Sequence, residues 1–294
     1  MKPVDFSLHQ PATLARATEL LAAHPDESKV LAGGQSLLPL LNFRLARPEH
    51  LISLDRVGGL SEVRRDGAGL HIGAMVRHAY AEHSQAVAQA CPLLAAAIPN
   101  IAHPPIRNRG TVGGSLAHAD PAAELPAVAA ALDATFRAVS VRGSRDIPAA
   151  EFFRSYLTTA LAADEVLIAI RFPVCPPRTG SAFLETGRRR GDFALVGVAA
   201  QLTMDGETIS DARLALSGIA DVPRRCAAAE AVLRGATAAP DVLDAAVSAE
   251  KAGLHPSGDL HGTADYRLHL AGTLLRRAIG QAHSNATAPR LRVA

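Results

Sequence analysis

Apolar residues recur along this 294-residue chain at helical spacing in some segments and in short strand-like runs in others. Helical spacing over residues 13–24, with Pro25 directly behind, predicts a first helix that ends at a breaker. Short apolar runs predict strands at 29–32 and 51–54, and the stretch 37–41 between them predicts a second short helix. The start of the chain is therefore predicted to be a small β–α–β unit with a glycine turn after its first strand.

The middle of the chain combines strands with Ala-rich helical segments. Residues 77–98 have a helical composition that is interrupted by Pro92, and a loop rich in Pro and Gly follows over 99–114. The Ala and Leu content of 122–132 predicts a further helix. Strands are predicted at 70–73, 136–141 and 166–172.

Pro173, Pro176 and Pro177 mark the clearest linker, and the pattern changes beyond it. Two strand-like runs flank the turn residues Asp205 and Gly206, which predicts a β-hairpin. These runs are 194–203 and 209–216, and helices are predicted after them at 227–233, 240–252 and 264–279. We expect a division into residues 1–57, 58–175 and a smaller α+β domain at 178–285, with a frayed tail after His283.

Composition and charge argue against several classes of function. Apolar residues make up 48% and charged residues 20%, with no Trp, which is typical of a soluble globular protein. The net charge of +2 is spread along the chain, and the run Arg188 to Arg190 is interpreted as a solvated face, so we expect no nucleic-acid partner. Because the N-terminus lacks an apolar signal region and no apolar stretch is long enough to span a membrane, we expect a cytoplasmic protein.

The three cysteines, Cys91, Cys175 and Cys226, are far apart in the sequence. They cannot supply the closely spaced ligand sets that hold zinc or an iron–sulfur cluster, so we expect free and mostly buried thiols. The twelve histidines are scattered, and no metal site is predicted on this chain. Any iron–sulfur centre that serves this protein must therefore lie on another chain.

Two glycine clusters carry the candidate chemistry. They are Ala32-Gly33-Gly34-Gln35-Ser36 and Thr111-Val112-Gly113-Gly114-Ser115. Paired glycines beside hydroxyl residues expose main-chain N–H groups to a diphosphate, and a helix expected just after each pair would favour an anion further. Taken singly, each cluster is also compatible with an ordinary tight turn.

Other active-site motifs are absent from the sequence. It contains no G-x-x-x-x-G-K-[ST], G-x-G-x-x-G, G-x-S-x-G or H-E-x-x-H pattern, which excludes P-loop, Rossmann, hydrolase and zinc-protease interpretations. His103 and His118 flank the second cluster, and we interpret them as residues that stabilise the loop. No catalytic acid–base set is predicted.

The surroundings of the two clusters make the pattern specific. The run IRNRGTVGGSLAHADPAAE, residues 106–124, resembles the signature of the flavoprotein subunits of the xanthine dehydrogenase and carbon monoxide dehydrogenase family. AGGQSLLP at 32–39, DEVLIAIRFP at 164–173 and RRGDFALVGVA at 189–199 resemble the same family in the expected order. The resemblance covers nearly the whole chain.

This resemblance implies an α+β protein with a two-part FAD-binding domain of the vanillyl alcohol oxidase (PCMH) type. Residues 1–57 and 58–175 would form its two subdomains, and 178–285 a C-terminal domain with a three-stranded antiparallel sheet and helices. The two loops would hold the diphosphate, Glu124 the ribityl hydroxyls, Phe193 and Ile101 the flavin ring, and Leu167 the adenine half. The implied FAD-binding positions are Ala32, Gly33, Gly34, Gln35, Ser36, Leu37, Ile101, Thr111, Val112, Gly113, Gly114, Ser115, Ala119, Asp120, Glu124, Leu167 and Phe193.

The resemblance further implies an electron-transfer subunit of a molybdenum hydroxylase, with FAD as its only cofactor. Its partners would be a small [2Fe-2S] subunit and a large molybdopterin subunit, in a dimer of heterotrimers. Relatives often carry a cofactor-contacting Lys near Leu184 or Glu185, where this chain has Leu and an acid, with Arg188 as the nearest cation. A self-contained flavin enzyme of the same fold and a docking subunit that has lost FAD stay as alternatives, and the substrate and the electron acceptor stay open.

Overall fold

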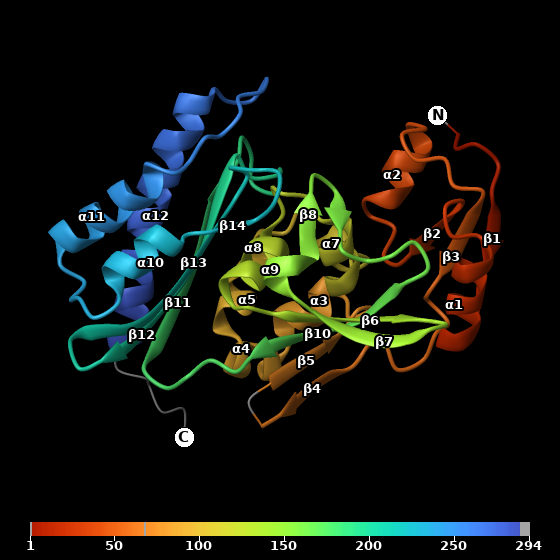
Figure 1. Cartoon of the computed structure of the whole chain (residues 1–294), viewed down its shortest axis with the longest axis horizontal. Coiled ribbons are helices and arrows are strands. Elements are labelled where there is room, and N and C mark those ends of the chain that lie inside the picture. Colours follow the sequence, from red (N-terminus) through yellow and green to blue (C-terminus); the bar gives the residue numbers. More distant parts are fainter. Residues whose placement is uncertain (1, 68, 289–294) are drawn as a thin grey trace. The chain divides into compact units, whose positions relative to one another are not determined.

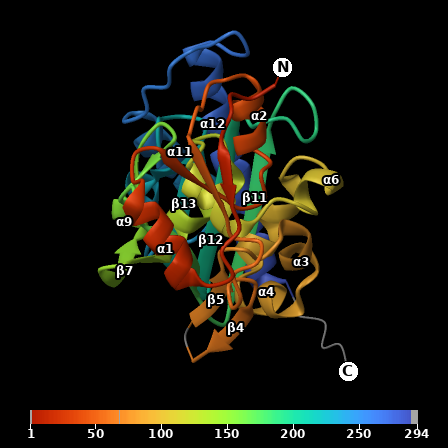
Figure 2. The ribbon, with the colours of Figure 1, turned by 90° about the vertical axis from the view of Figure 1, so that its right-hand side faces the viewer.

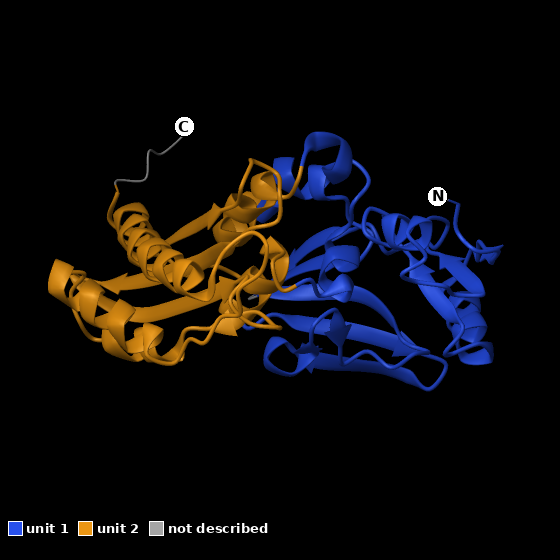
Figure 3. Ribbon diagram, turned by 90° about the horizontal axis from the view of Figure 1, so that it is seen from above, with its two compact units in different colours: residues 1–87, 103–120, 133–173 blue, residues 88–102, 121–132, 174–294 orange. Residues whose placement is uncertain are grey.

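The computed structural model describes residues 2–67 and 69–288, and its contacts group into two compact units (Figure 3). Unit 1 comprises residues up to 87, 103–120 and 133–173, and unit 2 comprises 88–102, 121–132 and the chain from 174 onward. The chain enters unit 2 for the last time at Val174, within the proline-rich linker. Two segments that precede this linker nevertheless belong to unit 2.

The N-terminal part of unit 1 is a parallel three-stranded sheet in the order β1-β3-β2, with α1 alongside it (Figure 1). Both predicted strands are present, each beginning one residue earlier than expected. The sequence pattern did not predict β1, because this strand is only three residues long and its Leu8 is 53% exposed. The elements are β1 (Ser7–His9), α1 (Leu14–Ala23), β2 (Ser28–Leu31), α2 (Leu37–Asn42) and β3 (His50–Ser53).

Helix α1 begins and ends where the sequence predicts. The side chain of Thr13 caps its N-terminus by accepting a hydrogen bond from Arg16 N at 3.2 Å, and His24 is the C-cap residue. Ala17 and Leu21 are buried on one face of the helix. They pack in a cluster with Ile52 and other apolar residues that include Leu54, Met75 and Val166. This core joins the small parallel sheet to the larger sheet of unit 1.

The larger sheet of unit 1 is antiparallel, in the order β4-β5-β10-β6-β7, with β4 and β5 adjacent at one edge (Figure 2). Its strands are β4 (Val63–Asp66), β5 (Gly69–Gly73), β6 (Thr135–Ser140), β7 (Gly143–Pro148) and β10 (Val166–Pro173). Phe136 and Phe152 stack at 3.8 Å between ring centroids beside it. The other unit 1 elements are α3 (His78–His83), α6 (Pro104–Arg107), α7 (Val112–His118), α9 (Ala149–Phe152), and a small ribbon of β8 (Phe153–Ser155) and β9 (Thr158–Thr159).

Prolines begin helices at two places where the sequence analysis predicted interruption. Pro92 starts α5 and separates it from α4, as the predicted interruption requires, whereas Pro104 starts α6 inside the predicted loop. Proline lacks only an N–H group that the first helical turn leaves unbonded in any case, so this position tolerates it. The predicted loop 99–114 therefore contains parts of three helices, which are η1 (Ile98–Asn100), α6 and the first turn of α7.

Unit 2 is built on an antiparallel sheet in the order β11-β12-β13-β14. Helices α10, α11 and α12 lie on one side of it and α5 and α8 on the other (Figure 1). The strands are β11 (Thr179–Thr186), β12 (Val196–Asp205), β13 (Thr208–Ser217) and β14 (Arg224–Arg225). The helices are α4 (Gln85–Ala90) at the boundary between the units, then α5 (Pro92–Ala97), η1, α8 (Glu124–Ala131), α10 (Ala227–Leu233), α11 (Pro240–Lys251) and α12 (Ala264–Thr287).

Strand periodicity explains this layering. Alternate residues of β12, among them Val198, Ala200 and Leu202, belong to the apolar cluster that includes Leu275 and Ile279 of α12. Helix α8 is buried almost all round and packs against β12 and β13. It is fixed there by hydrogen bonds from two arginine side chains to its C-terminal carbonyl groups, Arg225 to Ala130 O (3.0 Å) and Arg213 to Leu132 O (3.4 Å).

The α+β class and the antiparallel C-terminal sheet are confirmed, and the sheet has a two-residue fourth strand beyond the three expected. The hairpin at Asp205 and Gly206 is also confirmed, with Gly206 at φ +60°. Helix α12 continues to Thr287, so the fraying expected after His283 is wrong as far as the described residues extend, and residues 289–294 lie outside them. In the described ranges no helix is both long and apolar enough to cross a membrane.

Candidate functional site

The first glycine cluster connects strand β2 to helix α2 and leaves its main-chain donors free. Gly34 adopts φ +73°, a left-handed conformation that favours glycine. Within the described residues, no hydrogen bond is formed by the N–H groups of 33–37. Among the described residues, the side-chain hydrogen bond formed at these positions is Gln35 Nε2 donating to Gly33 O at 3.0 Å. A turn with consecutive free N–H groups is the kind of concave donor array that binds anions.

The second cluster differs from the expectation that a helix begins after its glycines. Thr111 is the N-cap of α7, so Gly113 and Gly114 lie in the first helical turn. Gly113 N donates to Ala74 O at 2.9 Å, and Gly114 N donates to Thr111 Oγ1 at 3.0 Å. Val112 N donates to the main chain of Val76 at 2.9 Å. The N–H groups at the start of α7 are therefore occupied, and the expected contribution of this helix terminus to anion binding is wrong for these three donors.

The structure brings the two clusters into contact. A Cβ added at Gly33 would lie 2.3 Å from the carbonyl oxygen of Arg109 and 2.8 Å from Gly110 Cα. A Cβ at Gly114 would lie 3.4 Å from Ala32 Cβ. Gly33 is therefore required because main chain from the second loop passes directly over it. The free donors of the first loop and the N-terminal turn of α7 share one surface of unit 1.

Two hydroxyl groups on this surface are available to a ligand. Ser36 and Ser115 are both partly exposed, and neither hydroxyl group forms a hydrogen bond with any described residue. The Thr111 hydroxyl, in contrast, is used by its own helix. The remaining positions expected in unit 1 follow one of the two loops or lie in the sheet. Leu37 begins α2, Ala119 is the left-handed C-cap of α7 at φ +54°, Asp120 follows it, and Leu167 is buried in β10.

Arg107 and Glu82 support the second loop and were not predicted as site residues. Arg107 Nε lies 2.7 Å from Glu82 Oε2, and Nη2 lies 3.2 Å from Oε1, which makes a two-pronged ion pair. Both side chains are nearly buried, with exposed fractions of 11% and 16%. The arginine of the IRN motif therefore anchors α6 to α3 within unit 1. Arg77 adds a second support, because it donates to Arg109 O and pairs with Asp55 at 3.0 Å.

His78 lies under the second loop as a neutral imidazole. Burial is the main cause that lowers its pKa to about 4, with the main chain of Thr111 opposing the shift and Arg107 lowering the pKa further. Neither ring nitrogen has a hydrogen-bond partner among the residues that the structure describes. A Cβ at Gly110 would lie 2.9 Å from His78 Nδ1, so the loop rests directly on this ring.

The expected residues of unit 2 form a separate group. Ile101 is buried next to η1, Glu124 is the buried first residue of α8, and Phe193 is 62% exposed. Glu185 occupies one wall of a cavity of about 430 Å³, which is also lined by Asn100, Thr186, Gly187, Arg189 and Arg190. Its Oε2 atom is buried without a hydrogen-bond partner among the described residues. Burial, and secondly the charge of Glu124, raise the pKa of Glu185 to about 8.

Comparison with known proteins identifies the family of this chain. Residues 4–175 match the family described as the FAD-binding domain in molybdopterin dehydrogenase, and residues 181–282 match the CO dehydrogenase flavoprotein C-terminal domain. The chain belongs to the FAD-binding medium-subunit family of molybdenum hydroxylases.

Individual members of the medium-subunit family resemble the chain over almost its whole length. The nicotine 6-hydroxylase medium subunit of Paenarthrobacter nicotinovorans is 43% identical and is aligned over 96% of this chain and 99% of the relative. Subunit alpha of the 6-hydroxypseudooxynicotine dehydrogenase complex from the same organism is 41% identical, with 96% of each chain covered. A solved carbon monoxide dehydrogenase from Hydrogenophaga pseudoflava matches with a TM-score of 0.95 at 38% identity, covering 97% of this chain and 99% of that one. The expected family, FAD-binding character and oxidoreductase class are confirmed.

Proposed function

We propose that this chain is the electron-transfer subunit of a heterotrimeric molybdenum hydroxylase. It would relay electrons from the [2Fe-2S] clusters of a small partner subunit to an external acceptor, while the substrate is oxidised on a large molybdopterin subunit. The observation that carries this proposal is the array of free N–H groups at 33–37, set against the second glycine loop. Such an array suits the diphosphate of FAD, which supplies one- and two-electron redox chemistry when bound.

The residues of unit 1 would hold the diphosphate unequally. The first loop, Ala32 to Leu37, offers main-chain donors and the Ser36 hydroxyl. In the second loop, Thr111 to Ser115, most main-chain N–H groups are already hydrogen-bonded. This loop would therefore contribute the Ser115 hydroxyl, and its glycines would let the diphosphate approach the main chain of α7. Leu167 would provide an apolar wall for the adenine half, and Ala119 and Asp120 would border the site.

For unit 2 the support comes from the family resemblance. Glu124 would bind ribityl hydroxyls, Ile101 would pack near the flavin ring, and the exposed Phe193 would cover it. Relatives often carry a lysine near Leu184 or Glu185, and Glu185 is the acid that this chain has there. Because its pKa is raised to about 8, the Glu185 side chain would be a hydrogen-bond donor at neutral pH, where a lysine would be a cation.

The partner chains are inferred from what this chain lacks and from its relatives. Its three cysteines, Cys91, Cys175 and Cys226, are too few for the four cysteine ligands of a [2Fe-2S] cluster. The relatives are named as medium or alpha subunits of hydroxylase and dehydrogenase complexes. We therefore propose a dimer of heterotrimers in the cytoplasm, with domain limits at 1–57, 58–175 and 178–285 as expected above.

Binding through the loops is tested with the two free hydroxyls. Ser36→Ala and Ser115→Ala should each weaken FAD binding about tenfold, since a hydrogen bond to a charged group contributes about 1.5–3 kcal/mol and about 1.4 kcal/mol is one decade of affinity. Ser257→Ala, an exposed serine of unit 2, is the matched control. Fluorescence titration of the deflavinated chain measures the affinity. Equal FAD affinities of the wild type and the three variants would show that these loops do not bind the diphosphate.

The relay role is tested by anaerobic reduction. The chain is expressed alone, loaded with FAD, and shown to be reducible by dithionite before candidate substrates such as carbon monoxide or nicotine are added. We expect no flavin bleaching until the two partner subunits are present. Bleaching by the chain alone would favour the self-contained flavin enzyme. Purified chain that cannot be loaded with FAD at all would favour the docking subunit.

A further inference from the structure

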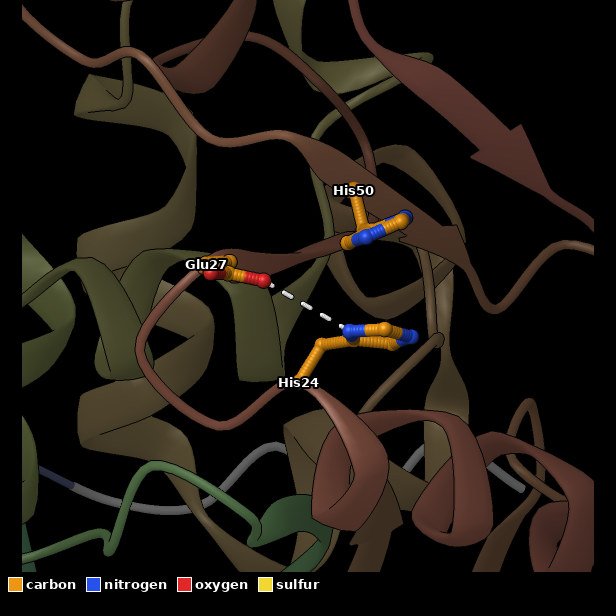
Figure 4. A group of neighbouring side chains, drawn as sticks. All are labelled: His24, Glu27 and His50. Carbon is orange, nitrogen blue, oxygen red and sulfur yellow. Dashed lines mark ion pairs between the residues drawn. The ribbon is translucent and has the colours of Figure 1, made fainter.

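Three histidines and one glutamate from four segments of unit 1 converge at the end of helix α1. His24 is the C-cap of α1, Glu27 lies in the turn before β2, and His50 begins β3 (Figure 4). His9, the last residue of β1, joins them with its Nε2 atom 3.0 Å from His50 Nδ1. None of these residues belongs to the glycine loops, so the proposed flavin function does not use them.

The main chain holds these side chains in place. Glu27 O accepts hydrogen bonds from Glu49 N at 2.8 Å and from His50 N at 3.1 Å, which ties the turn to the start of β3. His24 N donates to Leu21 O at 3.2 Å and ends α1 at this point. Strand β1 pairs in parallel with β3. The positions of the four residues therefore follow from the folded backbone before any ligand is present.

The ligand atoms lie within reach of a single ion. One ligand atom each from His24, Glu27 and His50 lies within 4.8 Å of the other two. His24 Nδ1 is 3.5 Å from Glu27 Oε2, and the rings of His24 and His50 are 4.0 Å apart (Figure 4). With zinc–ligand distances near 2.0–2.1 Å, neighbouring ligands of a tetrahedral site are roughly 3.3 Å apart. The 3.5 Å separation of His24 Nδ1 and Glu27 Oε2 is already close to that spacing.

We propose that His24, Glu27 and His50 form a binding site for Zn²⁺, with a fourth position open to water and with His9 hydrogen-bonded to the His50 ring. Imidazole and carboxylate ligands suit zinc, whereas magnesium and calcium prefer sites made wholly of oxygen. Arg16 on α1 is neutralised by Glu19 at 2.9 Å, so it adds little repulsion of a cation. Bound zinc would link the end of α1 and the turn before β2 to β3. Because zinc has no redox chemistry, it would take no part in electron transfer.

The experiment uses the full-length chain after removal of metals with EDTA. Calorimetric titration with ZnCl₂ should show one ion per chain and raise the melting temperature, and CoCl₂ should produce the visible bands of a four- or five-coordinate Co²⁺ ion. His24→Ala and His50→Ala should each lower zinc affinity at least about tenfold. His255→Ala, an exposed histidine of unit 2, should bind zinc as the wild type does.

Glu27→Gln keeps the size of an exposed side chain and removes only its charge, so it tests the site without disturbing the fold. It should also lower zinc affinity, while flavin loading and the melting temperature in EDTA stay at wild-type values. This pattern is independent of the proposed function, because the readouts are zinc affinity and metal-dependent melting. Absence of zinc binding to the wild type, or equal binding by the cluster variants and by His255→Ala, overturns the proposal.

Discussion

The raised pKa of Glu185 makes the stability of this protein depend on pH in a defined direction. Burial, and then the charge of Glu124, move the pKa of Glu185 from 4.5 to about 8 in the folded chain. Below about pH 4.5 the carboxyl group is protonated in both the folded and the unfolded state, and its contribution is constant. As the pH rises from 4.5 to 8, only the unfolded state loses the proton, so the free energy of unfolding falls.

The size of this effect follows from the shift and from the exposure of the side chain. A shift of this size for a fully buried group corresponds to roughly 5 kcal/mol, at about 1.4 kcal/mol per pKa unit. Glu185 is only partly buried, and solvent screens part of the interaction, so we expect about 1–2 kcal/mol. Glu185→Gln cannot ionise. Relative to the wild type, the variant should gain this amount of stability as the pH rises from about 4.5 to 8.

Urea unfolding from pH 5 to 8.5 measures this difference, with Glu207→Gln in the exposed turn between β12 and β13 as the control. The difference in the free energy of unfolding between variant and wild type cancels the contribution of the histidines, which is common to both proteins. Glu124→Gln removes the second cause of the shift and should move the transition to lower pH. A stability difference between Glu185→Gln and wild type that does not change with pH would refute the reasoning.

Three further predictions concern the ion pair that supports the second glycine loop, the packing of α7 and the access of an electron acceptor to the flavin. Arg107→Ala leaves the buried Glu82 carboxylate unpaired and should lower the free energy of unfolding by about 3–5 kcal/mol in chemical denaturation, with the exposed Arg154→Ala as control. Gly113→Ala should be destabilising by about 1–3 kcal/mol even without FAD, because the new Cβ would lie 2.4 Å from Ala74 Cβ; unchanged melting of the deflavinated protein would contradict this. Phe193→Ala should retain FAD but alter the rate of reoxidation in stopped-flow measurements, and loss of FAD would show a different role for Phe193.

Strands that face solvent were the main part of the fold that hydrophobic pattern could not predict. Strand β4 reads VRRD and β7 reads GSRDIP, and both are edge strands whose side chains are mostly exposed. Strand β11 was missed for a different reason. Its small residues are buried because α12 lies against them, so closely that a Cβ at Gly180 would be 2.1 Å from Ala282 O. That contact involves residues about a hundred positions apart and leaves no local pattern.

The candidate site was predictable where a local motif carries it. Both glycine loops were identified from sequence, but only the structure shows that the donors of the first loop are free and those at the start of α7 are bonded. Glu185 appeared in the sequence only as a departure from the family pattern, and its unusual protonation depends on the burial that folding produces. His9, His24 and His50 have no recognisable spacing, because two strands, β1 and β3, and the end of helix α1 bring them together.

The early position of α8 in the chain has a consequence for synthesis. This apolar helix ends at Ala131, while the strands that cover it, β12 and β13, begin only at Val196. At translation rates of roughly 5–20 residues per second, α8 is made about 3 to 13 s before β12 starts to appear. During that interval a nascent chain exposes Leu125 and Val128, which are fully buried in the finished protein. A ribosome-bound chain arrested before residue 196 should accordingly be a substrate for apolar-binding chaperones, and one released after the last strands should not.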